Sequence, residues 1–150
     1  MTVAVITGST KGVGRGLAEA FAARGLDVVV TGRSGEQAAE VAAGLPGTGS
    51  CLGLPLDVTD AASVQSVWDS ATDRFGRIDV WINNAGVAHT TQHIVDIPPG
   101  DVSAMVTTNM LGTIYGSQVA VRGMSAQGGG RLFNVLGGGS DGKIREFMGV

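Results

Sequence analysis

Residues 3–14 read VAVITGSTKGVG, and this stretch decides the fold of the chain. It begins with the apolar run Val3 to Ile6 and continues into a loop with three glycines in eight positions. A glycine-rich loop that leads into a helix offers free backbone amides and the positive end of a helix dipole. The stretch therefore predicts a phosphate-binding loop, with an ordinary structural turn as the alternative.

Short β-branched runs alternate with longer segments of helical spacing along the rest of the chain. The expected strands are Val3–Thr7, Val28–Thr31, Leu52–Val58, Ile78–Asn83 and Leu132–Val135. Apolar residues recur at helical spacing between them, and the longest such stripe runs from Val102 to Val119. Ser34 is expected to cap the second helix, and Thr59 or Asp60 the third. This alternation predicts an α/β fold with a doubly wound parallel sheet, covered by helices on both faces.

Ligands of such a sheet bind beyond the carboxyl ends of its strands. Five conspicuous stretches fall at these ends: Thr7–Gly14, Gly32–Arg33, Asp57–Val58, Asn83–Gly86 and Leu136–Gly142. The sequence therefore predicts that they share one rim of the sheet.

Composition narrows the class of protein. The 150 residues suit one domain, and a net charge of −3 without a basic cluster argues against nucleic-acid binding. The apolar stretches are strand-sized and the N-terminus lacks a signal-peptide pattern, so we expect no membrane association and a cytoplasmic location. The single Cys51 cannot form an internal disulfide, and no Cys/His spacing suggests a metal site.

Three further motifs accompany the first loop. "LDV" closes the third expected strand at Val58, "NNAG" follows the fourth at Asn83–Gly86, and Asn109 lies within the long fourth helix. Together and in this order they resemble the short-chain dehydrogenase/reductase family, from Thr2 to about Gly142. The resemblance implies a Rossmann sheet with strand order 3-2-1-4-5. It also implies that residues 1–150 are one NAD(P)-binding domain, incomplete at its C-terminus and truncated before strands six and seven.

The same resemblance implies how a dinucleotide is held. The expected cofactor-binding residues are Gly8, Ser9, Thr10, Lys11, Gly12, Val13, Gly14, Arg33, Asp57, Val58, Asn84, Ala85 and Gly86. A side chain at Gly14 is expected to fill the space of the pyrophosphate and to leave Asn84 untouched.

The second strand ends without the carboxylate that usually binds the ribose 2′-hydroxyl of NAD. Arg33 stands there instead, and Lys11 lies in the neighbouring loop. Two cations and no acid favour NADP(H), unless Arg33 is merely a solvated loop residue.

The family's chemistry needs a tyrosine in a Tyr-x-x-x-Lys motif, as the resemblance implies. The only tyrosine, Tyr115, is followed by Gly-Ser-Gln-Val, so it is expected to be a packing residue. Asn109 is the expected helix residue whose kink supports a water in the proton relay. Ser140 is either the family's substrate-polarising serine or a turn residue, and the surrounding Gly137–Gly142 pattern resembles the chlorophyll b reductase branch.

The leading hypothesis is therefore the cofactor-binding portion of an NADP-dependent oxidoreductase that acts on a small carbonyl or alcohol. A non-catalytic dinucleotide-binding module and an inactive truncation product are the alternatives. The family often pairs through its fourth helix, so a homodimer through residues 101–122 is a further hypothesis. We also expect Met105, Val106 and Ile114 to be exposed on that helix.

Overall fold

The computed structural model describes residues 1–88 and 93–137. Its strands are β1 (Val3–Ile6), β2 (Asp27–Gly32), β3 (Cys51–Pro55), β4 (Val80–Asn83) and β5 (Arg131–Asn134). Its longer helices are α1 (Gly12–Ala22), α2 (Gly35–Ala43), α3 (Ala61–Phe75), α4 (Pro99–Met105) and α5 (Gly112–Ala126). A 3₁₀ turn, η1 (Ile94–Asp96), precedes α4, and a π-helical segment, η2 (Val106–Leu111), joins α4 to α5.

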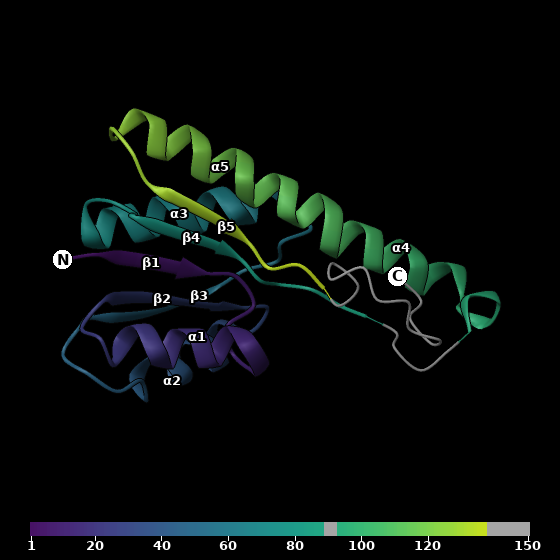
Figure 1. Ribbon diagram of the computed structural model, residues 1–150, viewed down its shortest axis with the longest axis horizontal. Helices are drawn as coiled ribbons and strands as arrows, with labels where there is room; N and C mark the ends of the chain where they lie inside the picture. The colour runs from purple at the N-terminus through teal and green to yellow at the C-terminus, as the bar shows by residue number, and fades with distance from the viewer. Residues whose placement is uncertain (89–92, 138–150) are drawn as a thin grey trace.

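The five strands form one parallel sheet in the order β3-β2-β1-β4-β5, as predicted. Helices α1 and α2 cover one face, and α3 and α5 cover the other (Figure 1). Successive side chains of β1 point to opposite faces of the sheet. Val5 therefore packs with α3 and α5, whereas Ile6 packs with α1 and α2. The doubly wound fold is confirmed.

Most strand boundaries agree with the sequence within two residues, but the third strand is shorter than predicted. It ends at Pro55 rather than Val58. Beyond it, Leu56 still donates to the Gly32 carbonyl, but the Asp57 carboxylate then accepts hydrogen bonds from Thr59 and turns the chain. The side chain of Asp57 therefore competes with the ladder and ends the strand.

The helix starts follow the predicted caps. The Ser34 hydroxyl accepts the amide of Gln37, and the Asp60 carboxylate accepts the amide of Ala62. Of the two candidates for the third helix, Asp60 is therefore the residue that caps it.

The predicted fourth helix is three consecutive segments, α4, η2 and α5, and its α4 end extends beyond the carboxyl ends of the strands (Figure 1). Two glycines let α5 approach the core: a Cβ at Gly123 would collide with the Trp68 ring, and one at Gly116 with the Asn83 amide. The expected exposure of Met105 is wrong, because this residue is only 7% exposed. The neighbouring apolar residues Val106 and Ile114 are exposed, as expected.

Candidate nucleotide-binding site

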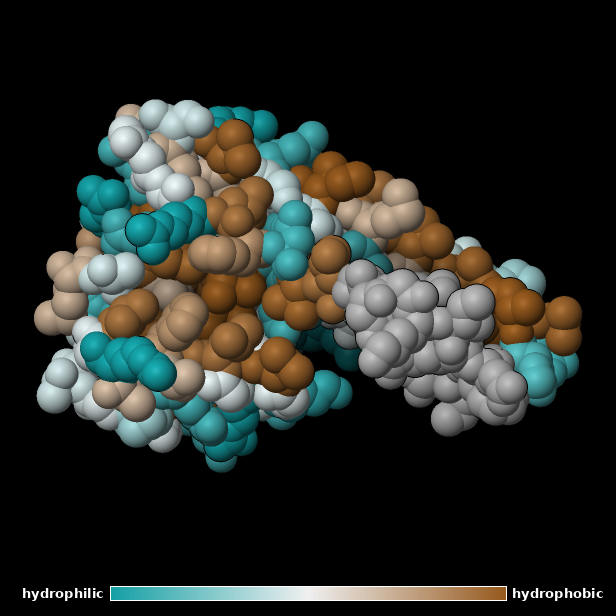
Figure 2. All heavy atoms as spheres, in the orientation of Figure 1, coloured by the Kyte–Doolittle hydropathy of each residue, from teal (hydrophilic) through white to brown (hydrophobic). Residues whose placement is uncertain are grey.

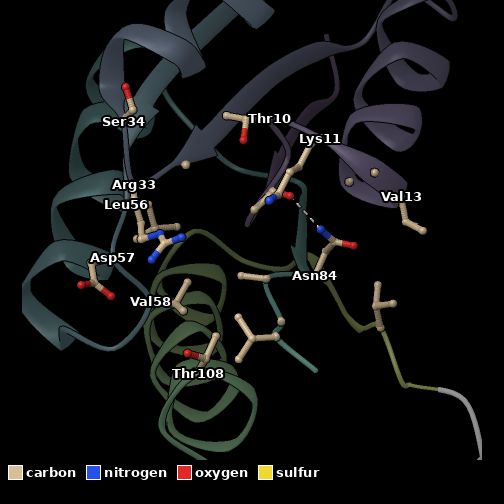
Figure 3. A pocket seen from close by; sticks show the side chains of 18 of the residues that line it. Thr10, Lys11, Val13, Arg33, Ser34, Leu56, Asp57, Val58, Asn84 and Thr108 are labelled. Carbon is tan, nitrogen blue, oxygen red and sulfur yellow. Dashed lines mark hydrogen bonds between the residues drawn. The ribbon is translucent and has the colours of Figure 1, made fainter. Parts of the chain in front are cut away.

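A cavity of about 850 Å³ opens at the carboxyl ends of the strands (Figure 3). It is lined by Gly8, Thr10, Lys11, Gly12, Val13, Gly14, Gly32, Arg33, Ser34, Gln37, Leu56, Asp57, Val58, Thr59, Asn84, Ala85, Gly86, Val87, Thr108 and Val135. Segments that follow all five strands contribute, and four of the five predicted stretches are among them. After β5 it is Val135 that lines the cavity, and most of the fifth predicted stretch, residues 138–142, lies outside the described residues. The size suits an organic cofactor.

Ser9 is the one expected cofactor residue of the first loop that does not line this cavity. It is fully buried, its hydroxyl donates to the Ile6 carbonyl at 2.8 Å, and the same oxygen accepts the Thr31 amide at 2.9 Å. Thr31 in turn donates to the Ile6 carbonyl and accepts the Gly8 amide. These two hydroxyls anchor the base of the loop between β1 and β2.

A second set of bonds ties the same loop to the end of β4. The Thr7 hydroxyl accepts the backbone amides of Asn84 and Ala85, both at 2.9 Å. The Asn84 side chain donates to the carbonyls of Thr7 at 2.9 Å and Gly8 at 3.1 Å. Gly8 has a positive φ of 65°, and a Cβ there would lie 2.9 Å from the Cα of Ala85. The loop is therefore shaped before any ligand arrives.

Gly14 corrects one expectation. A Cβ at this position would collide with the Asn84 side-chain nitrogen and would lie 2.6 Å from the Gly8 carbonyl oxygen. The space beside Gly14 is thus filled by protein, and Asn84 would not stay untouched. Gly12 differs, because nothing lies within 4 Å of its would-be Cβ. Gly12 therefore stands at the open part of the loop.

Two cations and one carboxylate line the cavity. Lys11 and Arg33 both extend into it (Figure 3), and Asp57 enters from the segment after β3. Hydrogen bonds from the Thr59 hydroxyl and amide lower the pKa of Asp57, and the charge of Arg33 lowers it further, while partial burial opposes. The prediction counted no acid near Arg33. None stands at the end of β2, but Asp57 lies near enough for the charge of Arg33 to lower its pKa.

Asn109 lies within the π-helical segment η2. Its side chain binds the backbone of Val87 at two atoms, accepting the amide at 2.9 Å and donating to the carbonyl at 2.8 Å. Because Val87 lines the cavity, Asn109 fixes part of the wall without lining it. π-Helical turns often mark functional sites, so the irregularity fits the kink expected at Asn109.

The remaining catalytic expectations fare differently. Ser140 lies outside the described residues, so its two interpretations stay open. Tyr115 packs against the core cluster beneath α5, as expected of a packing residue. Within residues 1–88 and 93–137, no group of three or more His, Cys, Asp or Glu could hold a metal ion. No helix in the same part of the chain is long and apolar enough to cross a membrane.

Sequence reasoning missed several residues of the site. Thr7 holds the loop through its hydroxyl, whereas Val87 and Thr108 line the cavity. Val87 follows "NNAG" directly, and Thr108 precedes Asn109, so adjacency to the motifs was the available signal.

The model of the short chain dehydrogenase family matches residues 2–144. The chain belongs to the short-chain dehydrogenase/reductase family. A chloroplastic chlorophyll(ide) b reductase of Oryza sativa subsp. japonica is 37% identical over 93% of this chain and 42% of its own length. A D-beta-hydroxybutyrate dehydrogenase of Cupriavidus necator is 34% identical over 88% of the chain and 51% of its own length.

A solved structure agrees with these relatives. The crystal structure of a short-chain type dehydrogenase/reductase from Mycobacterium marinum is 31% identical, with a TM-score of 0.87 over 98% of this chain and 58% of its own. The chain thus spans about half the length of the relatives it matches. The resemblance to the family and to its chlorophyll b reductase branch is confirmed.

Proposed function

We propose that residues 1–150 are the NADP-binding portion of a short-chain oxidoreductase that transfers hydride between NADP(H) and a small carbonyl or alcohol substrate. The observation that carries this proposal is the preshaped loop at Gly8–Gly14 in a cavity whose cations are Lys11 and Arg33. Enzymes of the family use NAD or NADP, and the open side of Gly12 leaves room for a phosphate group beside the start of α1.

Each lining segment has a proposed part in holding the dinucleotide. The loop amides and the N-terminus of α1 receive the pyrophosphate, and Asp57 and Val58 flank the adenine. Arg33 and Lys11 receive the ribose 2′-phosphate, because guanidinium and ammonium groups pair with phosphate. Ala85 and Gly86 lie beside the ribose. When bound, the nicotinamide supplies the hydride, and these residues hold it in place.

Catalysis needs groups beyond those described. Asn109 can support a water through its π turn and Ser140 can polarise a carbonyl, but neither supplies the proton of a tuned phenol. No Tyr-x-x-x-Lys motif occurs in residues 1–150.

The substrate, assembly and location are proposals of the same kind. Relatives named as chlorophyll(ide) b reductase and hydroxybutyrate dehydrogenase both suggest a carbonyl or alcohol substrate. Four exposed apolar residues at i, i+4 spacing favour a homodimer through the helix around 101–122: Val102, Val106, Met110 and Ile114. A cytoplasmic location stays a prediction, and the rice relative is named as chloroplastic.

Calorimetric titration with NADPH and NADH tests the central proposal. We expect NADPH to bind at least tenfold more tightly, and 2′,5′-ADP to bind better than 5′-AMP because only the former carries the 2′-phosphate. Equal affinities would remove NADP preference from the proposal. Absence of binding by a chain shown to be folded by circular dichroism would remove the nucleotide site itself.

A further inference from the structure

A buried amide joins β4 to α5. Asn83 is only 5% exposed, and its Oδ1 accepts the indole N–H of Trp81 at 2.8 Å. Its Nδ2 donates to the Asn134 side chain at 2.9 Å, to the Ser117 hydroxyl at 3.1 Å and to the Thr113 carbonyl at 3.3 Å. Asn83 therefore fixes where this turn of α5 stands along the sheet.

Thr113 links this fixed turn to the π-helical segment. Its hydroxyl donates to the carbonyl of Asn109 at 2.8 Å, one turn earlier in the chain. A π turn replaces the usual i+4 partners of the helix with i+5 partners, so its backbone geometry depends on what supports it locally. A threonine hydroxyl that bonds the i−4 carbonyl is a known means of bending a helix.

We propose that Thr113 is a positioning residue for the nucleotide cavity. Its hydroxyl holds the η2 turn in the register at which the Asn109 side chain reaches both backbone atoms of Val87. The path therefore runs from the buried Asn83, through Thr113 and Asn109, to the cavity wall at Val87. Only the consequence for cofactor affinity rests on the proposed function, because the bonds themselves need no ligand.

The helix supplies a matched control. The Thr107 hydroxyl donates to the Ser103 carbonyl at 2.7 Å, which is the same i−4 bond in the same helix but does not involve Asn109. Thr113→Val and Thr107→Val each remove one such hydroxyl, whereas Thr113→Ser retains it. Any effect of losing a helical threonine in general would appear in both valine variants.

Amide hydrogen exchange measured by NMR gives a readout at the clamp. We expect Thr113→Val to speed exchange at the Val87 amide about tenfold, because a net hydrogen bond is worth about that factor. Thr113→Ser and Thr107→Val should exchange like the unmodified chain there. The amide of Val5, in the centre of the sheet, should be unchanged in every variant. Affinity for NADPH should fall about three- to tenfold in Thr113→Val alone.

Unchanged exchange at Val87 in a folded Thr113→Val chain would overturn the proposal. So would an equal acceleration in Thr107→Val, or an acceleration at Val5 as large as that at Val87, because either result means general loosening. If the unmodified chain binds neither NADPH nor NADH, the proposed function fails, while exchange at Val87 still decides the role of Thr113.

Discussion

The two sides of the cavity are built in different ways. On the β1–β2 side, the buried residues Thr7, Ser9 and Thr31 bond the loop to its neighbours, and Asn84 bonds it from the segment after β4. On the other side, Thr108 lines the cavity from the consecutive segments α4, η2 and α5. These segments carry exposed apolar residues such as Met110, 59% exposed, and Ile114, 44% exposed. Figure 2 shows hydrophobic residues along these segments where they extend beyond the carboxyl ends of the strands.

The two sides differ in whether their interactions are satisfied within the described residues. The loop side is held by bonds within the described residues, so its shape does not depend on a ligand. The helix side presents apolar surface that globular proteins usually cover, and β5 is an edge strand in the described sheet. We infer that the loop side holds the dinucleotide. We infer further that catalysis and assembly depend on protein surface that packs against the helix side.

The largest expected effect separates binding from catalysis. The chain of residues 1–150 should bind NADPH yet show no measurable NADPH-dependent carbonyl reduction, because a positioned proton donor is worth roughly 10²–10⁴ in rate. Adding a C-terminal segment that begins with Tyr-x-x-x-Lys should restore turnover. A spectrophotometric assay of NADPH oxidation measures this. Steady turnover by residues 1–150 that Ser140→Ala abolishes would contradict it.

The loop side should fail when its internal packing is disturbed. Gly14→Val places a side chain against Asn84 and the Gly8 carbonyl, so it should cost roughly 1–3 kcal/mol of stability and weaken NADPH binding more than a hundredfold. Gly16→Ala is the control, since nothing lies within 4 Å of a Cβ there. Thermal unfolding and calorimetry measure both effects. Normal affinity in a folded Gly14→Val chain would show that binding does not depend on the packing of Gly14 against Asn84.

Much of this arrangement could be predicted from the sequence, and the exceptions have physical causes. Alternating strand and helix patterns are local, so the strands and the parallel doubly wound sheet could be predicted from them, whereas the strand order was implied by the resemblance to the family. The clash between a Cβ at Gly14 and the Asn84 side chain could not be predicted from the sequence, because Asn84 lies seventy residues away in the chain. Likewise, Asp57 ends its own strand through Thr59, and Met105 turns inward where its helical neighbours stay exposed.

Removing the charge of Arg33 should weaken NADPH binding less than Gly14→Val does, but it tests the preference for NADPH over NADH directly. A charge-assisted bond is worth roughly 1.5–3 kcal/mol, so Arg33→Ala should weaken NADPH binding about ten- to a hundredfold and barely change NADH binding. Arg15→Ala is the control, because Arg15 pairs with Glu19 and does not line the cavity. Calorimetric titration with each cofactor measures this. A parallel loss for both cofactors would mean that Arg33 does not meet a 2′-phosphate.

The apolar face of the helix side should support self-association. Ile114→Glu places a charge in the centre of the exposed stripe and should weaken a dimer about tenfold or more, since burying an unpaired charge is costly. Val95→Glu is the control, because Val95 is also exposed but lies in η1. Sedimentation velocity over a concentration series distinguishes the two. Equal dimerisation of both variants would place the interface elsewhere.

The smallest expected effect concerns Asp57, the carboxylate that lines the cavity together with Arg33. The Thr59 hydroxyl donates to Asp57 at 2.7 Å and the Thr59 amide at 2.9 Å, and these bonds are the main causes that lower the pKa of Asp57. Thr59→Val removes only the hydroxyl bond, so the pKa of Asp57 should rise toward its ordinary value. Because the folded-state pKa is lowered, the stabilisation is present above the unfolded pKa, near 3.9, and is lost as the pH falls through the folded value. The stability difference between the unmodified chain and Thr59→Val should therefore persist at pH 7 and shrink in acid.

An NMR titration of the Asp57 carboxyl carbon measures the change in pKa. The control is Ser63→Ala, which removes a partner of the Asp57 amide but none of its carboxylate. A pKa in Thr59→Val that stays where it was would mean that the hydroxyl bond is not a main cause of the shift, which would leave the Thr59 amide and the charge of Arg33 to lower it.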